Sequence, residues 1–239
     1  MATIYAHTND GYVARFNQSS WSNARANTAG TSVSSTGTAS SIGVSASKVA
    51  SRGGGSAFNI YRSFFFFDTS GITTNLSEAT LKIRGTNFTT GDLIAVKSNS
   101  DIETLGTADF GSIVGWNTTT DGSGGGDNES NVTKYSAEIS TWSGTGYNNI
   151  ALNAQALADI RDDDTVYICL MNTDYDLRDV EPTGFSDNRN GIYYTNYTGT
   201  SRDPYIDYTL APAVSDMLYF LERIFEICSK KIVLVYYNK

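Results

Sequence analysis

The chain is poor in the residues that most enzyme sites and metal centres use. It has one histidine, His7, and two cysteines, Cys169 and Cys228, among 239 residues. A Ser/His/Asp or Cys/His catalytic arrangement would have to use His7, whose neighbours Ala6 and Thr8 indicate an ordinary strand residue. A zinc centre needs several His or Cys ligands, and the carboxylates fall in no recognisable glycosidase signature. The sequence therefore predicts a protein that is not an enzyme and holds no zinc.

Positive charge and long apolar runs are also scarce. The net charge is −8 and the sequence pI is about 4.6, so a phosphate backbone or an anionic membrane would be repelled. No run approaches the roughly 18 apolar residues of a membrane span, and the opening MATIYAHT lacks the basic and apolar regions of a secretory signal. We expect no nucleic-acid or membrane partner, and synthesis in the cytoplasm without a signal peptide.

Aromatic residues and glycine are abundant, while charged residues are few. The chain holds 15 Tyr, 11 Phe and 22 Gly, but only 3 Pro and 18% charged residues. Aromatic and β-branched segments separated by Gly and Asn turns are typical of β structure. Cys169 lies in the apolar run 165–171, which predicts a buried strand with the cysteine as a small core residue.

Periodicity places further elements along the first 210 residues. Residues 59–68 form a continuous aromatic run, which predicts a strand buried on both faces. In 77–85, Ala79, Leu81 and Ile83 alternate with polar residues, which predicts a strand with one buried face. Residues 153–161 carry the one helical pattern of this region, with Asn153 as its N-cap. We therefore expect an all-β sandwich with one short helix over residues 1–210.

The C-terminal segment, 211–239, has a different character. Residues 215–231 follow a helical pattern and 232–237 follow a strand pattern, and both are more apolar than an exposed terminus should be. The segment should pack on the β domain, pair with another copy or dock on a partner. The apolar positions that we expect to mediate this assembly are Met217, Leu221, Ile224, Phe225, Cys228, Val233 and Val235.

Three segments, in their order along the chain, carry a family resemblance. Residues 61–72 (YRSFFFFDTSGI), 79–83 (ATLKI) and 202–208 (RDPYIDY) resemble the DNRLRE-type, carbohydrate-binding-module-like jelly-roll modules over roughly residues 2–210. With 10–13 (DGYV) and 174–184 (DYDLRDVEPTG), the chain looks most similar to uncharacterised versions from bacteriophage and environmental genomes. The resemblance implies a jelly-roll sandwich, and it implies relatives that are either carbohydrate-binding modules or virion surface proteins.

Two sets of residues are candidates for ligand binding. Aromatic faces suit sugar stacking, so Trp116, Trp142, Tyr193 and Tyr194 are candidate glycan-binding residues, although the same aromatics could fill the core. Loop carboxylates suit a structural calcium ion. The calcium candidates are Asp121, Asp127 and Glu129, with the run Asp162 to Asp164 as the other option and a solvated acidic turn as the competing interpretation.

These observations favour a non-enzymatic virion structural protein, such as a capsid decoration, head-fibre or tail-associated jelly roll. Its partners would be further copies of itself and other virion proteins, with a host glycan as an additional ligand. Made without a signal in the host cytoplasm, it would end on the virion surface. The alternative is a carbohydrate-binding module of an extracellular or cell-surface protein.

Overall fold

The computed structural model describes residues 1–26, 29–37, 39–51, 54–99, 104–117, 126–185 and 188–212. The expected C-terminal helix and strand lie outside the described residues. Within those ranges the elements, in chain order, are β1 (Ala2–Tyr5), β2 (Gly11–Gln18), α1 (Trp21–Arg25), β3 (Ser32–Ser34), β4 (Ala39–Ala50), β5 (Ser56–Asp68), β6 (Leu76–Thr89), β7 (Leu93–Lys97), the 3-10 turn η1 (Thr107–Gly111), β8 (Tyr147–Ala151), α2 (Ala154–Asp162), β9 (Thr165–Asn172), the π turn η2 (Thr173–Leu177), β10 (Arg189–Tyr193) and β11 (Tyr205–Leu210).

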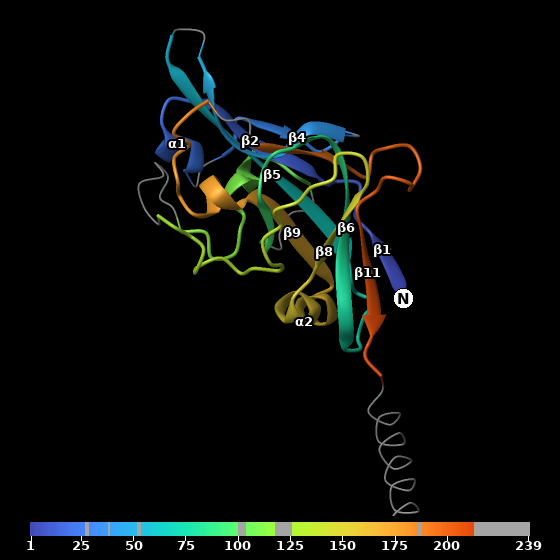
Figure 1. The fold of residues 1–239 in the computed structure, drawn as a ribbon. Coiled ribbons are helices and arrows are strands. Elements are labelled where there is room, and N and C mark those ends of the chain that lie inside the picture. Colours follow the sequence, from blue (N-terminus) through green and yellow to red (C-terminus); the bar gives the residue numbers. More distant parts are fainter. Residues whose placement is uncertain are drawn as a thin grey trace, which may run out of the picture.

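The strands pair antiparallel and form an all-β sandwich, as the sequence predicted (Figure 1). A short sheet has the order β1–β11–β6–β8. The larger sheet runs β10–β4–β5–β2–β3, and β9 and β7 continue it from the second half of β5. The long strand β6 joins the two sheets, because its first part pairs with β11 and its last part pairs with β10.

The strands β5, β9 and β7 form the middle layer of the molecule. One face of this layer carries Phe65 and Phe67 and packs against the inner side of the short sheet, where Leu81 and Ile206 lie. Its other face carries Phe64 and Phe66, which a layer of turns and loops covers. The prediction that the aromatic run is buried on both faces is therefore confirmed.

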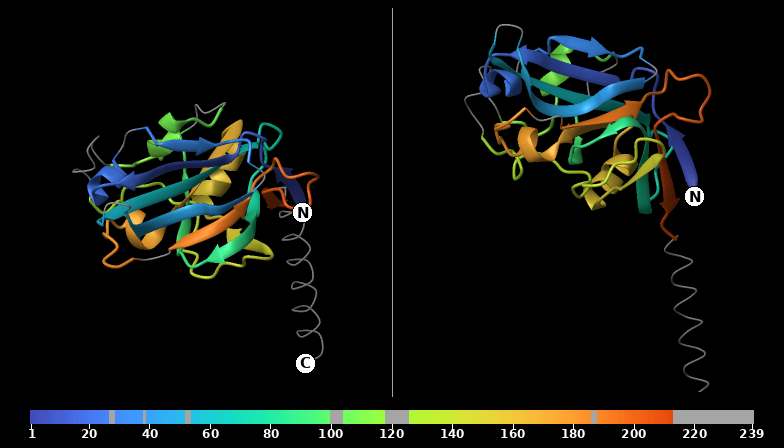
Figure 2. Two further views of the ribbon diagram at one scale, coloured as in Figure 1. Left: turned by 90° about the horizontal axis from the view of Figure 1, so that it is seen from above. Right: turned by 45° about the horizontal axis from the view of Figure 1, so that its top comes forward.

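The layer over the second face contains the short helix α1, the turns η1 and η2, and the loops between them (Figures 1 and 2). Helix α1 was not predicted, because it lies in a polar stretch with few apolar residues. Ser20 begins it, with its Oγ accepting a hydrogen bond from the Asn23 amide at 3.2 Å. Trp21 then packs edge-on against Phe58, which fixes the helix on the sheet.

Local sequence signals account for helix α2 and for the buried face of β6. The predicted helix is α2, and the Asn153 Oδ1 accepts a hydrogen bond from the Ala156 amide at 3.0 Å, as an N-cap should. Ala79, Leu81 and Ile83 are buried in β6, as their alternation predicted. None of the helices in the described ranges combines the length and apolarity that a membrane crossing requires.

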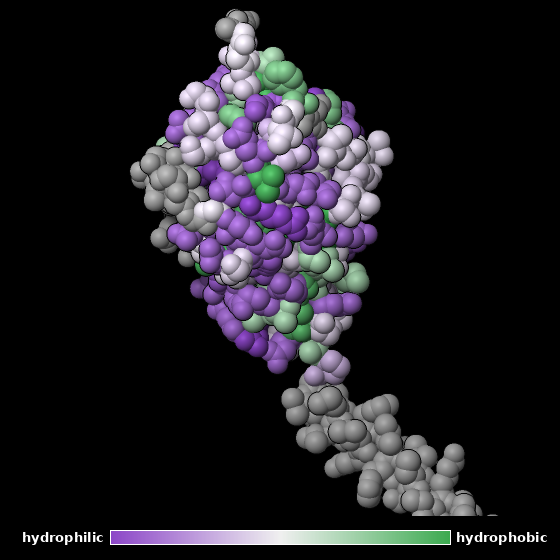
Figure 3. Space-filling model, turned by 60° about the vertical axis from the view of Figure 1, so that its left-hand side comes forward, coloured by the Kyte–Doolittle hydropathy of each residue, from purple (hydrophilic) through white to green (hydrophobic). Residues whose placement is uncertain are grey.

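The described surface is mainly hydrophilic on the face that Figure 3 shows. The large apolar side chains that are most exposed belong to Met1, Tyr5, Val180, Phe185 and Leu210. Of these, Tyr5 belongs to a larger aromatic group on the short sheet.

Candidate functional site

The outer face of the short sheet is open to solvent across all four strands. Side chains of Leu81, Ile150 and Ile206 point inward and are buried, so the alternate residues point outward. The outward positions, all exposed or half-buried, are Thr3 and Tyr5 in β1, Tyr205, Asp207 and Thr209 in β11, Glu78, Thr80, Lys82 and Arg84 in β6, and Tyr147, Asn149 and Ala151 in β8.

Three of these outward side chains, Tyr5, Tyr205 and Tyr147, form what we call the tyrosine row. Tyr5 pairs with Tyr205 across β1 and β11, and their ring centroids lie 5.7 Å apart. The Tyr147 ring, on β8, lies 5.2 Å from the Tyr205 ring in an edge-on arrangement. Tyr5 keeps 46% of its surface exposed. The row therefore crosses the sheet obliquely from the edge strand β1 to β8, because Tyr205 is opposite Lys82 on β6 whereas Tyr147 is opposite Arg84.

Polar groups flank the tyrosine row. Thr3 Oγ1 donates a hydrogen bond to Asp207 Oδ1 at 2.7 Å, and Lys82 Nζ lies 3.9 Å from Asp207 Oδ2. Partial burial raises the pKa of Tyr147 to about 12, so its hydroxyl stays protonated and donates to the Asp203 carbonyl. Aromatic faces beside hydroxyl, amide and carboxylate groups can stack on an apolar surface and hydrogen-bond a polar one.

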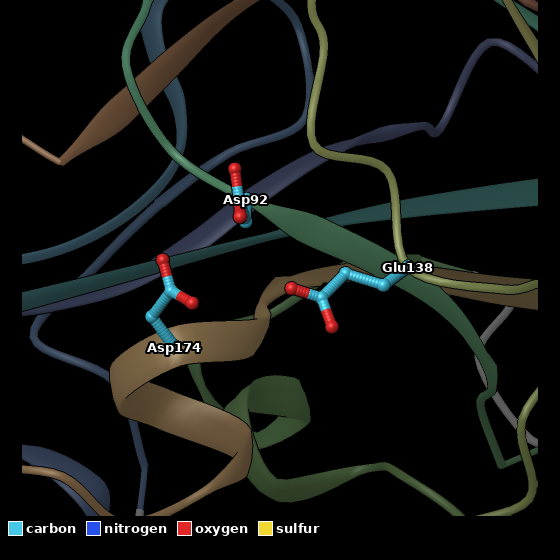
Figure 4. Close-up of side chains that lie close together, drawn as sticks. All are labelled: Asp92, Glu138 and Asp174. Atoms are coloured by element: carbon cyan, nitrogen blue, oxygen red, sulfur yellow. The ribbon is translucent and has the colours of Figure 1, made fainter.

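A second group, the carboxylate cluster, consists of Asp92, Glu138 and Asp174, whose oxygens lie within 4.8 Å of one another (Figure 4). Backbone pairing brings the three together. Leu93, the first residue of β7, pairs with both Asn172 and Ile139. Asp92 and Glu138 directly precede two of these positions, and Asp174 follows Asn172 by two residues, so all three lie near this pairing. Such oxygens suit a hard cation such as calcium.

Arg178 already lies among these carboxylates. Its Nη2 donates to Glu138 Oε2 at 2.7 Å, and its Nη1 lies 3.7 Å from Asp174 Oδ1. Burial raises the pKa of Asp174, and the charges of Asp92 and Glu138 raise it further. The Arg178 guanidinium therefore neutralises part of the negative charge of these carboxylates, which a bound cation would otherwise neutralise.

The residues predicted to bind calcium serve other contacts. Asp127 Oδ1 accepts a hydrogen bond from the Glu129 amide at 2.7 Å, which shapes the turn. The Glu129 carboxylate pairs with Arg178 at 3.1 Å and with Lys134 at 3.6 Å. Asp121 lies outside the described residues. The calcium prediction at these positions gains no support from the two residues that are described.

The two tryptophans predicted to stack on sugar are in the interior. Trp116 is 9% exposed, and its ring lies 4.2 Å from the Arg62 guanidinium and 5.0 Å from that of Arg25. Trp142 is 8% exposed, and its indole nitrogen donates to the Gly191 carbonyl at 3.1 Å. Their placement agrees with the competing interpretation, in which these rings fill the core.

The two predicted tyrosines differ from each other. Tyr194 is buried, and its hydroxyl lies 2.7 Å from Ser63 Oγ. Tyr193 is half-buried and contacts Tyr197 edge-on, with the Arg202 guanidinium over both rings. Only Tyr193 of the four glycan candidates thus offers part of its ring to solvent. The seven residues predicted to mediate assembly all lie in 213–239, outside the described residues.

An open hollow of about 460 Å³ lies beside the end of α2, lined by Lys97, Asp162 to Asp164, Thr165 and Tyr167. Lys97 Nζ donates to Asp159 Oδ2 at 3.0 Å and to Asp163 Oδ2 at 3.2 Å. The run Asp162 to Asp164, the other calcium option, therefore has a lysine ammonium at its middle carboxylate.

The sequence did not predict the tyrosine row, although the strand alternation that places its residues outward is visible in the sequence. The alternation that placed Leu81 inward also places Lys82 outward, and the same alternation in 204–210 places Tyr205 outward. What the sequence could not supply was the strand register, which aligns Tyr5 with Tyr205 over about 200 residues of chain.

No protein-family model matches the chain, and no curated protein matches it.

Proposed function

We propose that the protein is a non-enzymatic structural protein of a virion surface that adheres to glycans. The tyrosine row is the single observation that carries the adhesion. Tyrosine presents a large rigid face and a polar hydroxyl, and it is enriched where proteins bind partners. The virion context rests on the resemblance of the chain, through residues 10–13 and 174–184, to jelly-roll modules of bacteriophage and environmental genomes.

Two features of the described residues favour binding over catalysis. The Glu138 carboxylate is already engaged, because Arg178 Nη2 donates a hydrogen bond to its Oε2 at 2.7 Å. His7 is exposed, and its Nδ1 accepts a hydrogen bond from the Asn9 amide at 3.3 Å within a turn.

A glycan array with the intact chain tests the adhesion. The expected result is retention of at least one carbohydrate class, with weaker retention when the free carbohydrate is added as competitor. A chain that binds no carbohydrate on the array and none in affinity electrophoresis would overturn this part of the proposal.

Assembly through the C-terminal segment is the second candidate function. β11 ends at Leu210, which is half exposed, and the apolar sequence 213–239 follows directly. Light scattering on the full chain tests this idea, with Leu221→Glu and Ile224→Glu together as the perturbing variant and Glu226→Gln as the control. We expect the solution mass of the double variant to be lower than that of the wild type, and the solution mass of the control to equal that of the wild type. Equal masses for all three proteins would show that these apolar positions do not mediate assembly.

A further inference from the structure

We infer that the tyrosine row binds an internal stretch of a neutral, linear polysaccharide that lies across the strands of the short sheet. This inference rests on the proposed glycan adhesion and specifies its ligand. The direction of the row, the charges beside it and the chemistry of its rings each support one part of it.

The direction of the row favours an extended chain. Tyr5 lies on β1, which pairs only with β11, and Tyr147 lies on β8, which pairs only with β6 among the described strands. The row therefore starts at one edge of the sheet and ends at the other (Figures 1 and 2 show these strands). A polymer can continue past both edges, so the face suits the interior of a chain better than an isolated monosaccharide.

The charges of the face compensate one another. Lys82 lies 3.9 Å from Asp207. The Arg84 guanidinium donates to the Thr145 carbonyl at 2.9 Å and lies 5.8 Å from the Tyr147 ring centroid, and the Glu78 carboxylate accepts a hydrogen bond from Thr209 at 3.0 Å. With two cationic and two anionic outward side chains, the face carries no net charge, whereas the whole chain carries −8. A neutral ligand meets no repulsion here, and a polyanion would be repelled by the molecule as a whole.

The chemistry of the row matches the two surfaces of a sugar ring. The face of a pyranose that carries axial C–H groups is apolar and can stack on Tyr5 and Tyr205. Its equatorial hydroxyls can exchange hydrogen bonds with Asp207, Lys82 and Asn149, which lie in or next to the same cross-strand register. Apolar contact with a few polar groups that fix orientation is the usual composition of a small-molecule site.

Affinity electrophoresis of the full chain tests the inference directly. The gels contain neutral linear polysaccharides (a β-glucan, a xylan or a mannan), acidic ones (alginate or pectate), or no polysaccharide. Monosaccharides serve as soluble competitors. We expect retardation by at least one neutral polymer, none by the acidic ones, and weak competition by monosaccharides.

Substitutions locate the binding face. Tyr5→Ala and Tyr205→Ala should each weaken binding at least about tenfold, as truncation of an aromatic anchor does, whereas Tyr5→Phe, which keeps the ring, should retain most of it. Tyr197→Ala is the matched control, because Tyr197 belongs to the separate group with Tyr193 and Arg202. Because Tyr5 is half exposed on an edge strand, its variants should unfold at the wild-type denaturant concentration.

The possible failures are distinguishable. If a polysaccharide binds but Tyr5→Ala and Tyr205→Ala leave the binding unchanged, the adhesion function stands and the assignment to the tyrosine row is wrong. Preference for an acidic polymer overturns the assignment of a neutral ligand. If the Tyr205→Ala variant has a lower solution mass than the wild type, the face binds a second copy of the chain, and the inference is overturned. If no carbohydrate binds at all, the adhesion function and this inference fail together.

Discussion

The buried ion pair between Arg62 and Asp176 gives the sharpest prediction for stability. Both side chains are fully buried, and Arg62 donates two hydrogen bonds of 2.7 Å to the two Asp176 oxygens. The third Arg62 nitrogen donates to the Phe110 carbonyl at 2.7 Å, and the Trp116 ring stacks 4.2 Å from the guanidinium. Arg25 approaches the same carboxylate at 3.7 Å. Asp176→Ala therefore leaves a buried cation without its carboxylate.

The size of the effect follows from this geometry. Removing one partner of a buried ion pair typically costs about 3–5 kcal/mol, because the remaining charge stays desolvated. Arg25 keeps its second carboxylate, Asp179, at 2.7 Å, so most of the loss falls on Arg62. The control is Asp162→Ala, which removes an exposed partner of Arg161 and should leave the unfolding midpoint close to that of the wild type.

Urea unfolding followed by tryptophan fluorescence measures both variants. We expect the unfolding midpoint of Asp176→Ala to fall well below those of the wild type and of Asp162→Ala, with similar slopes. The paired substitution Arg62→Met with Asp176→Leu should recover most of the loss, because it removes both charges. If Asp176→Ala and Asp162→Ala have the same unfolding midpoint in urea, the buried pair does not hold the loop layer on the sheet, and the reasoning is wrong.

Three further predictions concern buried groups. Burial raises the pKa of Asp10 from 3.8 to about 7, so the contribution of this carboxyl to stability is greatest below about pH 4 and falls by up to about 4 kcal/mol as the pH rises through 7. Asp10→Asn should therefore be more stable than wild type at pH 8 and not at pH 4, and equal pH profiles in urea unfolding would contradict this. A Cβ on Gly85 would lie 1.9 Å from the Ser143 carbonyl oxygen, so Gly85→Ala should lower stability by about 1–3 kcal/mol in the same assay. Burial raises the pKa of the Cys169 thiol, so a Cys228→Ser chain should react with a thiol reagent only after urea is added, and rapid labelling of the native chain would show that Cys169 is accessible.

The sequence predicted best where the local pattern alone decides the structure. Four consecutive phenylalanines, Phe64 to Phe67, lie in a short run that turn residues flank, which favours a strand covered on both sides, and they are buried in β5. Period-two alternation fixed the buried face of β6, and the Asn153 side chain marked the start of α2. Each of these signals depends on neighbours within a few residues.

Long-range partners explain what the sequence did not predict. Arg62 is a charged residue in an aromatic run, and only the fold shows that Asp176 meets it from 114 residues away. Trp116 and Trp142 looked suitable for sugar because tryptophan often lies at binding faces, but in this fold Trp116 covers the buried guanidinium of Arg62. The register that assembles the tyrosine row likewise joins β1, β11 and β8, which are distant in the sequence.

The polar groups of the side chains explain why the tryptophan Trp142 is buried while the tyrosines of the row lie at the surface. The Trp142 indole has a single donor, which the Gly191 carbonyl satisfies inside the protein. A tyrosine hydroxyl both donates and accepts, so Tyr5 and Tyr205 can lie half in water at little cost. Cross-strand aromatic pairs stabilise a sheet by only about 0.2–1 kcal/mol each, a gain that a pair of threonines could partly replace. Stability alone therefore does not require an aromatic row at the solvent face, and this favours a role for these rings in recognition.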